Sequence, residues 1–162
     1  MTKIASGAFH ICAIKEGSLY SWGKGIDGQL GNGSYSNSYE PTKVTCLGSD
    51  VEDVSCGQNH TLVRSSSECY SFGNGIFGQL GVNSNKNSNV PVRVHLFNVE
   101  DIAAGENHSL FISEGEVYGC GENKFGETGT GLVKKYVLEP KPTGLKNVAT
   151  IKGGKISGAL TN

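Results

Sequence analysis

The sequence has few of the features that mark membrane-spanning or secreted proteins. Its 162 residues include only 4 Pro, 1 Trp and 1 Met. No stretch approaches the roughly 20 apolar residues of a membrane span, and residues 1–10 lack the charged and then apolar pattern of a signal peptide. We therefore expect an intracellular protein, cytoplasmic or nuclear, without a membrane partner.

The sequence also lacks an excess of charge of either sign. Lys and Arg total 14, Asp and Glu total 15, and the net charge is −1. Such a balance gives no general attraction to phosphate backbones or to anionic lipid. We therefore predict no nucleic-acid partner.

The cysteines show no pairing pattern. Five is an odd number, and no two of them form a C-x-x-C motif, so the sequence indicates neither a disulfide framework nor a zinc site. We predict no metal and no cofactor. The five are Cys12, Cys46, Cys56, Cys69 and Cys120.

Glycine, by contrast, is abundant, at 24 residues, and much of it recurs periodically. The tetrapeptide G-x-x-H ends at His10, His60 and His108, with spacings of 50 and 48 residues, and a degenerate copy without histidine follows at 154–157. Self-similarity at this period is typical of a solenoid or a β-propeller.

A second motif follows each histidine by twelve residues. Trp22, Phe72 and Cys120 each precede a glycine and open a glycine-rich run of ten residues, which extends over 22–31, 72–81 and 120–129. The cysteines at 12, 56, 69 and 120 fall in repeat positions that other units fill mostly with apolar residues. We interpret them as packing residues.

Alternation and turn residues predict about four short strands per unit, which is the size of one propeller blade. Glu16-Gly17 and Glu114-Gly115 have the chemistry of tight hairpin turns. Counted by unit, the expected strands number three, four, four and three. Those outside the first unit include 51–54, 99–102, 108–112 and 116–120, with Pro41–Val44 and Pro91–Val94 each starting at proline.

Two sets of equivalent positions predict unusual backbone. Gly25, Gly75 and Asn123 share one position, and since Gly and Asn enter positive φ most readily, we expect a left-handed turn there. A second such turn, or a close backbone approach, is expected at Gly28, Gly78 and Gly126.

These motifs together resemble the repeat of the regulator of chromosome condensation family. The shared features are G-x-x-H-[ST]-x-x-[IVL], the aromatic-Gly pair and G-Q-L-G, and they cover almost the whole chain. Departures are Asp27 and Cys120 in place of aromatics, Glu127-Thr128 in place of Gln-Leu, and Ser157 in place of His.

The resemblance implies an all-β, seven-bladed propeller, of which 162 residues supply less than half. We expect about three blades plus an incomplete fourth, in a single repeat domain that is part of a larger propeller. The units run approximately over 1–40, 41–90, 91–139 and 140–162. Exposed end blades would favour self-association.

Motifs that suggest chemistry have simpler explanations in the repeat. Residues 23–28 and 73–78 match G-x-G-x-x-G, but no helical pattern follows to bind a phosphate. His10, His60 and His108 could form a metal or proton site, yet a residue repeated once per unit normally serves the unit's own hydrogen bonding. We predict no catalytic residues.

The segments between units vary freely and are expected to line one face. They place Tyr35 and Tyr39 in the first such segment and Lys134, Lys135 and Tyr136 in the third as candidate partner-binding residues. Alternatively, the two first-unit tyrosines pack on the blade edge.

The resemblance implies a non-enzymatic scaffold for protein interactions. An alternative is guanine-nucleotide exchange on a Ran-like small GTPase, as in the family's founding member. The even repeat spacing leaves no room within these units for the inserted wedge that this activity uses there.

Overall fold

The computed structural model describes residues 2–153 and 158–161, which form fourteen strands and one short 3-10 turn. No helix in these residues is long and apolar enough to cross a membrane. The elements are β1 Lys3–Ser6, β2 His10–Lys15, β3 Ser18–Gly23, β4 Ser38–Lys43, η1 Thr45–Leu47, β5 Val51–Cys56, β6 His60–Ser65, β7 Glu68–Gly73, β8 Ser88–Val94, β9 Val99–Ala104, β10 His108–Ser113, β11 Glu116–Glu122, β12 Tyr136–Pro142, β13 Val148–Lys152 and β14 Gly158–Thr161.

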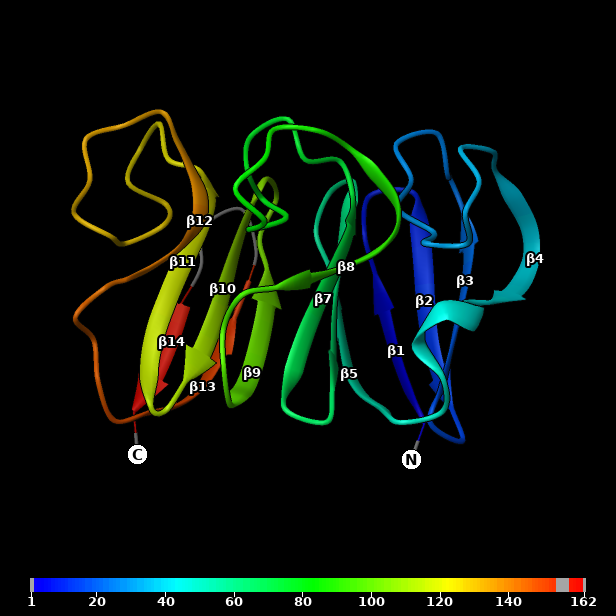
Figure 1. The fold of residues 1–162 in the computed structure, drawn as a ribbon, viewed down its shortest axis with the longest axis horizontal. Helices are drawn as coiled ribbons and strands as arrows, with labels where there is room; N and C mark the ends of the chain where they lie inside the picture. Colours follow the sequence, from blue (N-terminus) through cyan, green and yellow to red (C-terminus); the bar gives the residue numbers. More distant parts are fainter. Residues whose placement is uncertain (1, 154–157, 162) are drawn as a thin grey trace.

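The strands form three four-stranded antiparallel sheets and a two-stranded sheet, each a simple meander. The sheets stand side by side in chain order, so that the first strand of each lies next to the first strand of the following one (Figure 1). This is the architecture of a β-propeller arc. The expected fold of three blades with an incomplete fourth is confirmed.

The strand count per blade corrects the sequence prediction: the structure has four, four, four and two. The strands expected to begin at Pro41 and Pro91 begin three residues earlier and belong to the preceding sheet. Each proline lies within an outer strand whose pairing is irregular, where a missing N–H is tolerated. The unit limits near 40 and 90 therefore fall inside β4 and β8.

The tight hairpins are present as expected. Glu16 and Gly17 have φ of 50° and 75°, and Glu114 and Gly115 have φ of 50° and 77°. Two consecutive positive values match the twist of the flanking strands. The second blade makes the same turn with Ser66-Ser67, a pair the sequence did not single out.

The hydrophobic core lies between blades. One cluster joins Cys12 and Leu19 of the first blade to Val54, Val63 and Phe72 of the second. Two further clusters span the second and third blades and the third blade with β13. Each blade thus buries its apolar face only against its neighbour, as in other repeat proteins.

The aromatic-Gly position shows the same dependence on a neighbour. Phe72 is fully buried, and its ring lies 2.7 Å from where a Cβ on Gly31 of the preceding blade would be. Trp22 occupies this position in the first blade and is only half-buried. The difference follows from position in the arc, since no described blade precedes the first.

The glycine turns expected at Gly28, Gly78 and Gly126 are left-handed, with φ of 88°, 83° and 79°. The first two also approach the next blade. A Cβ on Gly28 would lie 2.4 Å from the Ser88 carbonyl oxygen, and one on Gly78 would lie 2.9 Å from that of Val137. Around Gly126 nothing lies within 4 Å.

The other glycine position corrects the prediction: neither Gly25, Gly75 nor Asn123 has positive φ. Glycine is needed there for space, because a Cβ would lie 2.0 Å from the Ser36 carbonyl oxygen in the first blade. In the third blade the loop is arranged differently. The Asn123 side chain donates from Nδ2 to the carbonyl of Leu132, at 2.8 Å.

The two glycines at 78 and 126 allow backbone strain to be separated from blade contact. We expect Gly78→Val to lower the free energy of unfolding by about 1–3 kcal/mol, because it adds a clash with the third blade to an unfavourable φ. Gly126→Val meets the φ penalty alone and should cost less. Denaturant titration of both variants measures the difference; equal losses would contradict a blade-contact role for Gly78.

Candidate functional site

A chain of hydrogen bonds links each repeated histidine to the next blade. His10 Nε2 lies 2.9 Å from Thr61 Oγ1, and this hydroxyl donates to the carbonyl oxygen of Gln29 at 2.9 Å. All three residues are fully buried or nearly so. The second interface repeats the arrangement: His60 Nε2 lies 2.9 Å from Ser109 Oγ, which donates to the carbonyl oxygen of Gln79 at 2.6 Å.

This geometry fixes the protonation of the rings. A hydroxyl has one hydrogen, and Thr61 gives it to the Gln29 carbonyl, so His10 Nε2 must be the donor in the first bond. The ring therefore carries a hydrogen on Nε2. Its other nitrogen, Nδ1, is buried and has no hydrogen-bond partner.

The first glycine of G-x-x-H makes room for the ring. A Cβ on Gly7 would lie 2.3 Å from Cε1 of His10, and one on Gly57 would lie 2.2 Å from Cε1 of His60. No side chain can be accommodated at that distance. The glycine of the tetrapeptide thus makes room for the histidine ring. The ring in turn binds the hydroxyl residue that follows the histidine of the next blade, Thr61 or Ser109.

Burial keeps His60 uncharged. Desolvation in the interior, with smaller contributions from the neighbouring His10 and His108, lowers the pKa of His60 to about 3. Burial also lowers the pKa of His108. Among the described residues, the three rings do not form a ligand cluster with one another.

The long loops lie together on one face. In all three blades the connection between the third and fourth strands emerges at the same edge, drawn at the top of Figure 1, while the two-residue hairpins lie at the opposite edge. All five candidate partner-binding residues lie in these loops or in the outer strands that follow them.

Tyr39 is the most exposed candidate in the first blade, at 96%, and Tyr35 is about half exposed. In register, Tyr39 corresponds to Asn89 and Leu138 of the next blades, whose Cα atoms lie against the turns of Gly28 and Gly78. No described blade covers Tyr39 in that way. It therefore lies on the open first face of the arc.

In the third blade, Lys134 and Lys135 are exposed and border a hollow of about 390 Å³, together with Leu132 and Val133. Lys134 also lines a second hollow, of about 300 Å³, beside Tyr136. The region combines exposed positive charge with exposed apolar surface, a composition suited to protein contact.

Tyr136 has a structural role as well. Its ring lies 5.7 Å from that of Phe77 in the second blade, with planes tilted by 34°. Phe125, the counterpart of Phe77, is 83% exposed. Tyr136 thus covers an aromatic of the blade before it, and Phe125 has no such cover among the described residues.

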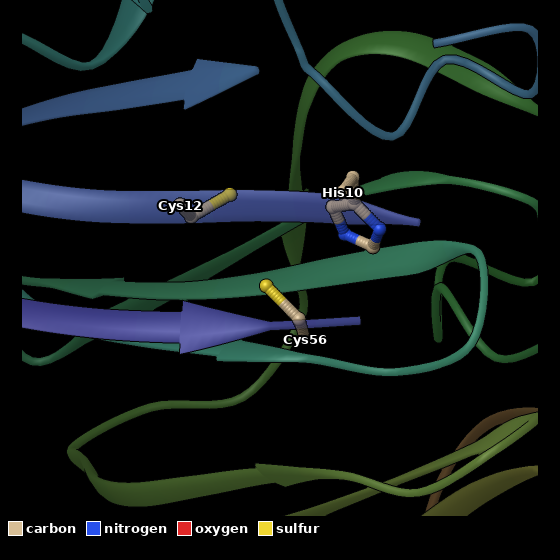
Figure 2. A group of neighbouring side chains, drawn as sticks. All are labelled: His10, Cys12 and Cys56. Carbon is tan, nitrogen blue, oxygen red and sulfur yellow. The ribbon is translucent and has the colours of Figure 1, made fainter. Parts of the chain in front are cut away.

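The structure brings together three side chains that the sequence did not connect. His10 and Cys12 lie on β2, and the sulfur of Cys56 at the end of β5 is directed towards them (Figure 2). A ring nitrogen and the two sulfur atoms lie within 4.8 Å of one another. No C-x-x-C motif marks the pair, since the cysteines come from different blades.

The two thiols influence each other. A hydrogen bond from Cys12 lowers the pKa of Cys56 to about 6, with a smaller contribution from His10 and against the effect of burial. The pKa of Cys12 is raised well above its usual value by the same bond and by burial. Burial likewise raises the pKa of Cys69 and of Cys120, which therefore remain thiols.

Comparison with protein families identifies one type of repeat. The model of the regulator of chromosome condensation (RCC1) repeat matches residues 16–64 and 66–112, and a second model of the same repeat matches 99–127. Together these matches cover more than half of the chain.

Individual relatives share shorter segments. The human E3 ubiquitin-protein ligase HERC2 is 41% identical over 66 residues, 40% of this chain and 1% of that protein. The human RCC1-like G exchanging factor-like protein is 38% identical over 68 residues, 41% of this chain and 14% of that protein. The chain thus matches only a small part of each relative.

Among solved structures, the complex of Kap60 with yeast RCC1 (Prp20) gives a TM-score of 0.83 at 26% identity. The match covers 98% of this chain and 41% of the solved one. The arc therefore has the backbone of part of an RCC1 propeller.

The low pKa of His60 predicts a pH dependence of stability. Its folded value, about 3, lies below the ordinary 6.5, so the unfolded chain takes up the proton first as pH falls. The contribution of the neutral His60 ring to the free energy of unfolding is therefore fully present above the unfolded-state pKa of 6.5. It decreases as the pH falls from there towards the folded-state pKa of about 3. We expect His60 alone to contribute a slope of roughly 1 kcal/mol per pH unit in that window.

The substitution His60→Gln keeps a donor for Ser109 but does not titrate, so the slope of unfolding free energy against pH should become shallower. Urea titrations at a series of pH values measure it. The exposed His95 serves as the control, since His95→Gln should leave the slope unchanged. Identical slopes for the wild type and His60→Gln would contradict a neutral buried ring.

Proposed function

The chain belongs to the regulator of chromosome condensation (RCC1) repeat family, and we propose that it is a non-enzymatic scaffold that binds a protein partner through the loop face of its propeller arc. The observation that carries the proposal is the third-blade loop, where Lys134 borders two adjoining hollows and Lys135 borders one of them, beside exposed Leu132 and Val133.

The relatives support a binding role. In HERC2 the similar segment is a small part of a ubiquitin ligase, and the yeast RCC1 structure is a complex with Kap60. A repeat arc that occurs within a much larger protein, or bound to another one, suits a module that presents surface. We place this scaffold inside the cell, in the cytoplasm or nucleus, because its five cysteines are free, as a reducing compartment keeps them.

Guanine-nucleotide exchange on a small GTPase is the second candidate. It is favoured by the 38% identity to the human RCC1-like G exchanging factor-like protein. Against it stands the uniform length of the three described blades, which contain no inserted wedge. The scaffold therefore remains the leading proposal.

The loop is tested with two variants. Cross-linking and quantitative mass spectrometry would compare proteins captured by the wild type, by Lys134→Ala/Lys135→Ala, and by Lys86→Ala in the polar middle loop. We expect at least one captured protein to fall by roughly 5-fold with the double variant, as from a loss of about 1 kcal/mol, and to persist with Lys86→Ala. Equal capture by all three would contradict the assignment of this loop.

An exchange assay separates the two candidate functions. The scaffold proposal expects release of labelled GDP from a panel of small GTPases to proceed at the intrinsic rate when the chain is added. Catalysed release from any of them would replace the scaffold with an exchange factor.

The ends of the arc suggest a second protein partner, another copy of the chain. Phe125 is exposed where its counterpart Phe77 is covered by Tyr136, and Tyr39, the counterpart of Leu138, is exposed on the first face. We expect light scattering to show association that rises with concentration and that Phe125→Asp weakens. The control is Phe97→Asp, which removes an exposed aromatic at the opposite edge. A monomer at all concentrations would exclude self-association.

A further inference from the structure

The first blade interface contains a side-chain cluster that the second interface lacks. At the positions of Cys12 and Cys56, the second interface has Leu62 and Ala104, which pack in one apolar cluster. The repeat fold therefore does not need sulfur at either position. Two thiols beside a histidine are a property of this one interface.

The cluster has the dimensions of a metal site. One ring nitrogen of His10 and the two sulfur atoms lie within 4.8 Å of one another, close enough for a single ion to contact all three after small side-chain rotations (Figure 2). His10 and Cys12 are buried, and Cys56 is half-buried. Cys56 also lines a hollow of about 400 Å³ between the ends of the inner strands, which gives an ion a path of entry.

The histidine is held in a form that can bind metal. Its Nε2–H donates to Thr61, whose hydroxyl is in turn fixed by the Gln29 carbonyl. A ligating imidazole must be neutral, and in proteins its other N–H usually has such a partner. The other ring nitrogen, Nδ1, is buried and has no hydrogen-bond partner.

We propose that His10, Cys12 and Cys56 form a metal site between the first two blades, which binds one thiophilic d10 cation of the class of Zn²⁺ and Cu⁺. Two thiolates and an imidazole are the soft and borderline ligands that these ions prefer over Mg²⁺ or Ca²⁺. Because β2 supplies two ligands and β5 the third, the ion would link neighbouring blades.

The repeat itself supplies the variants. Cys12→Leu/Cys56→Ala installs the residues of the second interface, so the fold should tolerate it. Cys56→Ser removes one soft ligand and installs the residue that the first blade has at this position, Ser6. Cys69→Val, which installs the residue of the third blade at a buried thiol outside the cluster, is the matched control. All proteins would carry Cys46→Ser, because an exposed thiol binds metal non-specifically.

Fully reduced protein would be titrated with Zn²⁺, and separately with Cu⁺, against a chromophoric chelator. We expect one ion per chain and an affinity at least ~100-fold higher for the parent and Cys69→Val than for the two cluster variants. Co²⁺ should give a thiolate charge-transfer band in the same two proteins. The ion that competes better with the chelator identifies which member of the class the site takes.

The bound ion should also raise the thermal midpoint of the parent and of Cys69→Val, and leave that of Cys56→Ser unchanged. Circular dichroism establishes that each variant is folded before titration. Equal affinities of the parent and folded Cys56→Ser for both ions, with no charge-transfer band, would overturn the proposal and leave the cysteines as packing residues.

Discussion

The structure depends on contact between consecutive blades, because no blade can bury its own faces. Each interface combines an apolar cluster with the buried bond from a histidine of one blade to a hydroxyl of the next. The hydroxyl in turn donates a hydrogen bond to a backbone carbonyl of the blade that carries the histidine. Nδ1 of His10 and of His60, and Nε2 of the Gln29 side chain, are buried without a hydrogen-bond partner. A hydrogen on Nε2 of the ring is therefore a condition of docking. This explains why the glycines and histidines recur together, since each serves the same junction.

The same constraint separates the architecture from the surface available for function. Within the arc, the positions that recur in every unit are used for packing between blades. Tyr136, which follows a loop, also packs against the neighbouring blade through Phe77. At the ends, the corresponding positions are open, as at Tyr39 and Phe125. The repeat does not determine the sequence of the loops, nor the presence of Cys12 and Cys56 on facing positions of two blades. Binding specificity in such a fold must reside in those places.

Much of the fold could be predicted from the chain. The period predicted blades, Glu114-Gly115 predicted a hairpin, and the left-handed turn at Gly78 followed from its recurrence. Two predictions were wrong for local reasons. The sequence predicts a strand that starts at Pro41, but the irregular outer strand β4 accepts this proline in its interior. It also predicts a left-handed Gly25, but glycine is required there for its small size, because a Cβ would lie 2.0 Å from the Ser36 carbonyl oxygen. The cysteine cluster could not be foreseen, because it depends on which repeat positions face each other across blades.

The central claim is that histidines that donate from Nε2 connect the blades, and that the ring of His60 is neutral. Imidazole ¹⁵N NMR as a function of pH tests it most directly, since it reports both the tautomer and the titration of each ring. The account predicts an Nε2–H tautomer for His10 and His60, and no protonation of His60 until the pH approaches its folded value of about 3. An Nδ1–H tautomer, or a His60 ring that titrates near 6.5, would contradict it.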